Sequence, residues 1–246
     1  MSDDKRIGRI RAVCSENQSI AQAFETAFTN LSRVNNLCKI YRESPGKGKG
    51  RKSVHQSDIL RSAVILVHAT LEDCLRTLSL YFLPESSIEL LNSVALSGLN
   101  ELGRPEKFNL GDLAKFKGKT IDEVIKKSVE EHLDRKSYNC VNDIITALKL
   151  FGLDPDNYRK YYSQFNDMIT RRHQIVHRGD RVKKPGRGKQ YAETIRLNTV
   201  EEWLNDTVGF IVNISHDLLD DPTSLQLIVD NIPLTMQPRE IKGSGA

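Results

Sequence analysis

The stretch from Ser57 to Phe82 constrains the fold more than any other part of this 246-residue chain. Its apolar residues recur at three- and four-residue intervals, a spacing typical of a helix with one buried face. The stripe consists of Leu60, Val64, Val67, Leu71, Cys74, Leu75, Leu78 and Phe82, and its first half is widened by Ile59, Ala63 and Leu66. We expect this helix, capped at Ser57 and ended by Pro84, to lie at the centre of a helical bundle.

Similar periodicity predicts further helices along the chain. They are expected at about residues 19–41, 87–96, 120–136, 141–151, 154–178 and 199–219. Thr120 with Glu123, and Thr199 with Glu202, have the capping-box form that starts a helix. Only 191–197 suggests a short extended segment, and no strand-rich region alternates apolar with polar residues. The sequence therefore predicts an all-α fold, an up-and-down helical bundle with additional helices and basic loops.

Length and composition indicate one helical domain with two tails. The length and the 39% hydrophobic content suit a single large domain over residues 19–220. We expect a flexible N-terminus over 1–18 and a C-terminal tail over 221–246, with an apolar segment at 225–229 docking on the bundle. The four cysteines lie far apart and form no CxxC pair, which argues against a zinc ribbon or a redox motif.

Charge and hydropathy limit where the protein can be located in the cell and which partners it can bind. No apolar run reaches membrane-spanning length and the N-terminus does not have the form of a secretory signal, so a cytoplasmic location without membrane insertion is expected. The formal net charge is +4, and two Gly-rich stretches, Lys47–Lys52 and Arg178–Lys189, hold a dense excess of positive charge. Loops of this kind suit a polyphosphate partner, or else keep the protein soluble.

The predicted helix over 154–178 carries a charge at a core position. Its apolar stripe consists of Tyr158, Tyr161, Tyr162, Phe165, Met168 and Ile169. The next position on this stripe is Arg172, followed by Ile175 and Val176. Arginine is rarely buried without a partner, so Arg172 is expected to meet an anion or to line a cleft. The helix should end near His177, because Gly179 suits the position just past a helix end.

The central helix also has a polar side. His68, Glu72 and Arg76 follow one another at four-residue intervals, with Arg61 on the same side. The simpler interpretation is a solvated face with a Glu72–Arg76 ion pair. The alternative is that His68 or Glu72 faces the same cleft as Arg172.

Two segments together resemble a known family. Arg172, the polar His173 and then His177 form an R-polar-x-x-x-H sequence at a helix end, which resembles the signature of the HEPN superfamily. The run Ile59–Asp73 is similar to the central helix of its RiboL-PSP-like branch, and the resemblance covers roughly residues 55–220. HEPN domains are small and α-helical, and many are metal-independent endoribonucleases. The resemblance implies a homodimer in which two motifs line one cleft.

Elementary chemistry fits that resemblance. Metal-free RNA cleavage needs a base for the 2′-hydroxyl, an acid for the 5′-oxygen and a cation at the phosphorane. His177 can transfer the protons and Arg172 can hold the phosphate, with His173 positioning or assisting. Five residues place Arg172 and His177 about 140° apart around a helix, so one straight helix does not point both at one phosphate easily.

Further roles are expected for three neighbouring side chains. Arg171 and Arg178 are predicted to contact flanking phosphates, and Glu72 to orient Arg172. His173 and His177 also have the i,i+4 spacing of a metal pair, but no glutamate stands between them, so we expect no metal and no cofactor.

Three functions stay open at this point. The first is a metal-independent endoribonuclease acting as a toxin or antiviral defence effector, with RNA, a second copy and an antitoxin or sensor protein as partners. The second is a non-catalytic HEPN-like module that binds RNA, a nucleotide or a partner protein. The third is a helical scaffold without a nucleic-acid role. The non-catalytic module would bind through the same cleft, whereas the simplest interpretation of the motif is a basic helix end, favourably placed near the negative end of the helix dipole.

Overall fold

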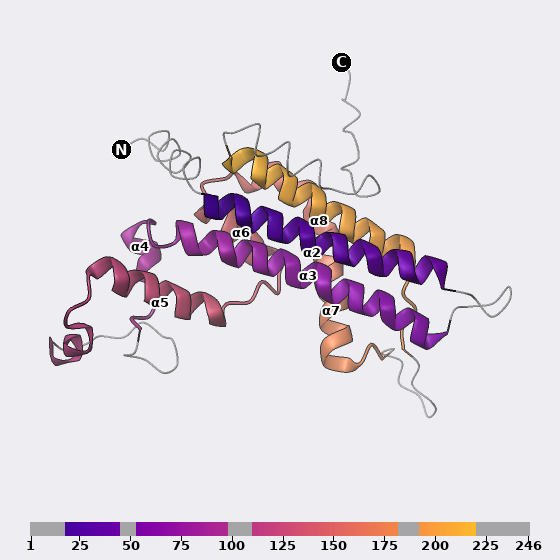
Figure 1. Cartoon of the computed structure of the whole chain (residues 1–246), viewed down its shortest axis with the longest axis horizontal. Coiled ribbons are helices and arrows are strands. Elements are labelled where there is room, and N and C mark those ends of the chain that lie inside the picture. The colour runs from indigo at the N-terminus through magenta and orange to yellow at the C-terminus, as the bar shows by residue number, and fades with distance from the viewer. Residues whose placement is uncertain (1–17, 45–52, 98–109, 182–191, 220–246) are drawn as a thin grey trace, which may run out of the picture. The chain divides into compact units, whose positions relative to one another are not determined.

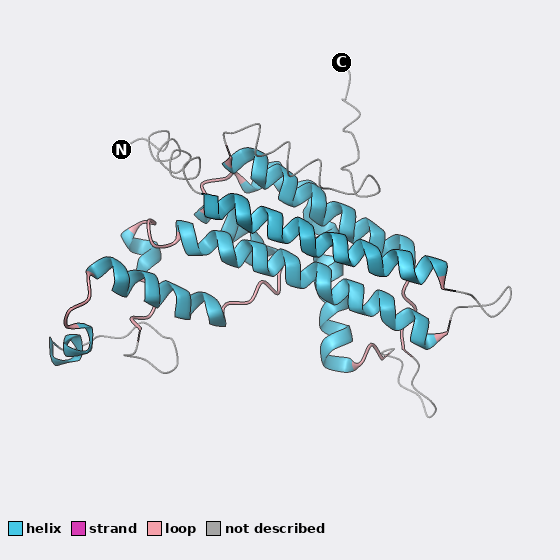
Figure 2. Cartoon of the chain, viewed as in Figure 1, coloured by secondary structure: helices cyan, strands magenta, loops and turns pink. Residues whose placement is uncertain are grey.

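The computed structural model of the chain describes residues 18–44, 53–97, 110–181 and 192–219. Its elements are α2 (Gln18–Glu43), α3 (Val54–Phe82), α4 (Ile88–Leu91), the 3₁₀ helix η1 (Leu110–Phe116), α5 (Ile121–Arg135), α6 (Val141–Leu150), the 3₁₀ helix η2 (Pro155–Tyr158), α7 (Arg159–Arg178) and α8 (Leu197–Leu218). Figure 2 draws no strand among these residues. Their only strand-like pairing is an isolated antiparallel bridge between Arg181 and Ala192. The predicted all-α fold is confirmed. No helix in the described part of the chain is long and apolar enough to cross a membrane.

The described residues divide into two compact units. One contains residues 75–97 and 110–155. The other contains residues 18–44, 53–74, 156–181 and 192–219. The expectation of a single domain over 19–220 stays a prediction. The second unit, called here the larger unit, carries the motif helix α7.

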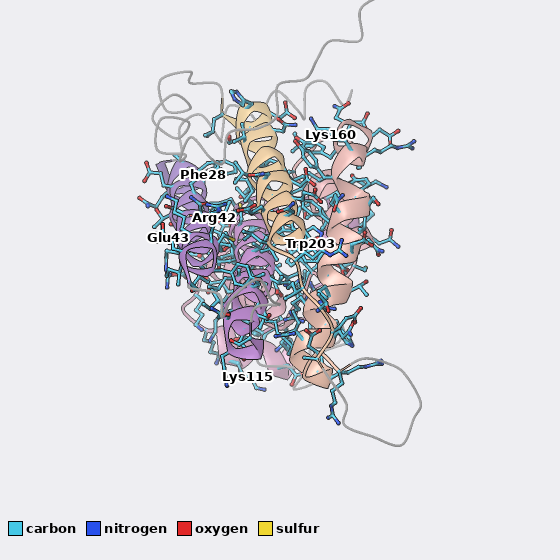
Figure 3. All side chains as sticks on the ribbon, turned by 90° about the vertical axis from the view of Figure 1, so that its right-hand side faces the viewer. Phe28, Arg42, Glu43, Lys115, Lys160 and Trp203 are labelled. Atoms are coloured by element: carbon cyan, nitrogen blue, oxygen red, sulfur yellow. The ribbon has the colours of Figure 1, made fainter. Side chains whose placement is uncertain are left out.

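Within the larger unit, α8 packs against both α2 and α7 (Figure 1). Its residues from Thr207 to Val212 are all buried, because neighbouring helices cover more than one of its faces. Other core side chains of this unit include Phe24, Leu31, Leu60, Val64, Val67 and Phe165. Figure 3 labels Phe28 of α2 and Trp203 of α8, both buried, and also Lys160, an exposed residue of α7.

An aromatic cluster joins α7 to α8. The ring of Phe210 lies edge-on to Tyr158, Tyr161 and Phe165, with centroid distances of 5.4, 5.6 and 5.0 Å. Gly209 allows this approach, because a Cβ at that position would lie 3.0 Å from the Tyr161 hydroxyl. Phe210 is therefore the centre of the contact that holds the motif helix on the bundle.

Two cysteines belong to the core of the larger unit. Cys38 and Cys74 are buried and make no disulfide. Burial raises the pKa of the Cys38 thiol to about 11, and burial raises that of Cys74 to about 12. Both thiols are therefore protonated at neutral pH and act as small apolar side chains.

The other unit has its own small core. Leu83, Val129 and Leu133 are buried, and Leu80, Leu91, Val94, Ile125 and Leu150 pack on them. Arg76 donates from Nε and Nη2 to the carbonyls of Leu133 and Lys136, at 3.1 and 3.0 Å, and so caps the end of α5. The capping box predicted at Thr120 is confirmed at the start of α5.

Several predicted boundaries shift. Ser57 is not the cap of α3; Ser53 is, since its hydroxyl accepts from the Gln56 N–H at 3.3 Å and its own N–H donates to Gln56 Oε1 at 2.9 Å. The helix α8 begins at Leu197, so Thr199 lies inside its first turn and is not a cap. The helix expected over 87–96 is only α4, and the extended 191–197 reduces to the bridge at Ala192 before α8 begins. Both tails, the 225–229 segment and most of the two basic loops lie outside the described residues.

The aromatic cluster predicts that Phe210→Ala destabilises the protein. Removing a fully buried ring that contacts three others should lower the free energy of unfolding by about 3–5 kcal/mol. Ile40→Ala, at a residue of α2 that is 52% exposed, should change it by less than about 0.5 kcal/mol. Urea unfolding followed by circular dichroism measures both variants. Similar losses in the two would contradict the central place given to Phe210.

Candidate functional site

The motif lies where α7 emerges from the core. Tyr161, Phe165, Met168 and Ile169 are its buried residues, all before the motif. One turn later Arg172 is half-buried, while His173 and His177 are exposed. The rings of the two histidines lie side by side, with centroids 4.5 Å apart and an interplanar angle of 44°. The structure thus presents both imidazoles to solvent on one face of the helix, with Arg172 at the edge of the core.

The helix ends in two consecutive left-handed residues. Gly179 has φ 56° and ψ 32°, and Asp180 has φ 58°. The N–H groups of both residues bond to the carbonyl of Gln174, for Asp180 at 3.2 Å. The glycine predicted to terminate this helix is confirmed. Aspartate tolerates the left-handed conformation better than most residues, so the chain can turn sharply straight after the motif.

A buried carboxylate fixes this turn. Asp180 Oδ2 accepts from Arg61 Nε of α3 at 2.6 Å and from Arg171 Nη2 of α7 at 2.8 Å. The side chain of Asp180 is 2% exposed, and those of the two arginines are 10% and 11% exposed. Two guanidinium groups on different helices therefore share one carboxylate out of contact with water, an arrangement stable only while all the charges are present.

A second carboxylate closes the same cluster from outside. Glu193 Oε2 lies 3.0 Å from Arg171 Nη1 and also accepts from Gln174 Nε2. The main chain of Glu193 is held separately, since its N–H donates to the Asp180 carbonyl at 2.7 Å and its carbonyl accepts from Arg61 Nη2 at 2.9 Å. The segment before α8 is thereby fastened to the end of the motif helix.

The ion cluster gives Arg171 partners within the protein. It was predicted to contact a flanking phosphate, but its guanidinium already contacts Asp180, Glu193 and the Glu193 carbonyl. Arg178 is exposed, and its carbonyl accepts from Arg181 Nε at 3.2 Å. The phosphate contacts of both residues stay predictions.

The polar side of α3 is less solvated than the sequence suggested. His68 is buried, and its Nδ1 lies 3.7 Å from Glu72 Oε2, whose side chain is 14% exposed. Arg61 is also buried, through its contact with Asp180. The solvated face is therefore wrong for His68 and Arg61. The role of Glu72 in orienting Arg172 stays a prediction.

Sequence reasoning missed Asp180, Glu193 and the burial of Arg61. One signal was present: Arg61 stands within the largely apolar run Ile59–Leu66, although it lies on the polar side of the helix with His68. Nothing local in the sequence identifies its partner, which lies 119 residues away. Within the described chain, no three His, Cys, Asp or Glu side chains are grouped so that they could hold a metal ion.

The helical bundle and the R-x₄-H sequence at the exposed end of α7 define an all-α domain of the HEPN class. A family model described as RiboL-PSP-HEPN matches residues 26–220, and the chain belongs to this family. The resemblance stated from the sequence is thus confirmed. No curated protein and no solved structure matches the chain.

The buried cluster predicts that Asp180→Asn destabilises the protein. Asparagine keeps the shape and tolerates the left-handed backbone, but it leaves two buried guanidinium groups without their shared anion. The free energy of unfolding should fall by about 3–5 kcal/mol. Asp156→Asn is the matched control, because its pair with Arg159 is 65% and 73% exposed and should contribute about 0–1 kcal/mol. Equal effects of the two substitutions on urea unfolding would refute the role of Asp180.

Proposed function

We propose that this protein is a metal-independent endoribonuclease of the HEPN type. Family membership supports an RNA-related role. The observation that carries the proposal is the end of α7, where a half-buried arginine immediately precedes two exposed, adjoining imidazoles along the helix. Histidine transfers protons near neutral pH, and arginine supplies a permanent charge shaped for phosphate oxygens.

The proposed reaction is an internal displacement at phosphorus. The 2′-hydroxyl loses its proton to a base and its oxygen bonds to the adjacent phosphorus. The bond from phosphorus to the 5′-oxygen breaks, and that oxygen takes a proton from an acid. The products are a 2′,3′-cyclic phosphate and a 5′-hydroxyl. In this scheme His177 acts as acid or base, Arg172 stabilises the charge on the phosphorane, and His173 positions or assists.

We further propose that the active form is a homodimer. One chain supplies His177 and Arg172, but the reaction requires both a base and an acid. The exposure of His173, Val176 and His177 supports this proposal, since all three side chains are available to a second copy. Two motif helices would then supply the two proton-transfer groups on either side of one phosphate.

A cellular role as a toxin or antiviral defence effector follows from such an activity. Cleavage of cellular RNA would require control by an antitoxin or sensor protein, and would take place in the cytoplasm. Expression of the wild-type chain should arrest growth of the host cell, while His177→Ala should not. Equal growth of the two strains at equal protein levels would count against this role.

The central prediction concerns cleavage of total RNA. We expect cleavage to persist in excess chelator, and His177→Ala to lower the rate by about 10²–10⁴-fold because a proton-transfer group is lost. Arg172→Ala should lower it by about 10²–10³-fold because a charge at the transition state is lost. His216→Ala, at an exposed histidine near the end of α8, is the matched control and should leave the rate unchanged.

The same assay separates the alternatives. Circular dichroism confirms that each variant folds, and the cleaved ends are mapped to detect the cyclic phosphate. A requirement for a divalent cation would replace the proposal with a metal site. Salt-sensitive RNA binding without any product would favour the non-catalytic module, and absence of binding at low salt would favour the scaffold.

A further inference from the structure

We propose that Arg171 and Gln174 form a second phosphate subsite, which the carboxylate of Glu193 occupies until an RNA backbone phosphate displaces it. The inference rests on the proposed function and deepens it. It names the group that binds beside the reacting phosphate and the internal group that competes with it.

The location of the subsite follows from helix geometry. Arg171, Gln174 and His177 succeed one another at three-residue intervals along α7. Residues three apart are neighbours on a helix surface, with about 5–6 Å between their Cβ atoms. Gln174 is therefore a surface neighbour of both Arg171 and His177, and the proposal places the phosphate next to the reacting one at the anion position of Arg171 and Gln174.

The two carboxylates of the cluster have different exposure. Asp180 is 2% exposed and sits between two helices, so an external anion does not reach it. The side chain of Glu193 is 47% exposed, although the Arg171 side chain that it contacts is 11% exposed. Glu193 thus covers the solvent side of a guanidinium that has its other contacts inside the protein. Only this carboxylate can exchange with a group from solution.

The main chain of Glu193 does not depend on its carboxylate. Its N–H donates to the Asp180 carbonyl at 2.7 Å, and its carbonyl accepts from Arg61 at 2.9 Å and from Arg171 at 3.1 Å. The side chain can swing out while these bonds keep the backbone in place. Removal of the carboxylate therefore exposes the two donors without opening the end of α7.

The donors suit a phosphodiester. Arg171 Nη1 and Gln174 Nε2 converge on the same oxygen, Glu193 Oε2. A phosphate presents oxygens that accept from a guanidinium and an amide in the same way, with charge-assisted hydrogen bonds at least as strong. A half-exposed ion pair adds little stability, so the phosphate has to replace only a weak interaction between Glu193 and Arg171. This exchange explains how Arg171 could contact a flanking phosphate, as the sequence predicts.

The test is binding of a single-stranded oligoribonucleotide of mixed sequence with 2′-O-methyl sugars, which cannot be cleaved by the proposed reaction. Glu193→Gln removes the competing charge, and we expect binding to become about two- to fivefold tighter, the ratio equivalent to an exposed ion pair. Glu201→Gln makes the same charge change at a surface pair with Arg42 and should alter the affinity less. Fluorescence anisotropy at several salt concentrations measures both full-length variants.

A double variant localises the effect. Gln174→Ala combined with Glu193→Gln removes one subsite donor and should lose a measurable part of the gain. Urea unfolding verifies that the variants retain the wild-type stability, as the main-chain bonds of residue 193 predict. The inference is overturned if Glu193→Gln binds no more tightly than Glu201→Gln, or if the double variant keeps the full gain.

The two proposals fail separately. If Glu193→Gln binds RNA more tightly but the wild type does not cleave it, the proposed endoribonuclease activity is wrong and the phosphate subsite stands. If the wild type cleaves RNA but Glu193→Gln does not change the RNA affinity, the phosphate subsite is wrong and the proposed endoribonuclease activity stands. A wild-type chain that does not bind the oligonucleotide at low salt would overturn the subsite directly.

Discussion

The carboxylate of Asp180, shared by Arg61 and Arg171, is the interaction on which the end of the motif helix depends. Together with the two arginines it connects α3 to the end of α7 and to the segment before α8. Arg61 of α3 lies 119 residues before Asp180 and 132 before Glu193, whereas Arg171 lies 9 residues before Asp180. The carboxylate and Arg61 are buried and Arg171 is largely so, and for this reason water does not readily replace the shared carboxylate if it is lost. The aromatic contact around Phe210 holds the first half of α7, and this ion cluster holds its end. Between them they determine which side of the last two turns faces solvent.

The helices were predictable because apolar periodicity is a local signal that survives folding. The stripe of α3 is buried at Leu60, Val64 and Val67, as expected. Helix starts were less predictable because several local caps compete. Ser53 with Gln56 prevailed over Ser57 at α3, a choice between two polar residues within one turn. At α8 the capping box of Thr199 was overridden, since Val200 is completely buried and the helix extends two residues further back.

The site was predictable in part. Arg172 and the two histidines follow from an interrupted stripe and a family motif, both readable in one segment. The ion cluster was not, because it depends on pairing between distant segments that no local pattern encodes. Arg61 was assigned to a solvated face because it shares the polar side of α3 with Glu72 and Arg76. The structure shows that an arginine inside an apolar run can indicate a buried anion elsewhere in the chain.

The isolated bridge between Arg181 and Ala192 has a consequence for insertions beside the motif helix. The chain leaves the end of α7 and returns to almost the same point, where Asp180 and Glu193 are also hydrogen-bonded. The entropic cost of closing a loop grows slowly with its length, so insertions between these anchors disturb the rest of the protein little. Residues inserted here would lie beside an unchanged motif helix. The same junction offers protein engineers a graft site next to the proposed active centre.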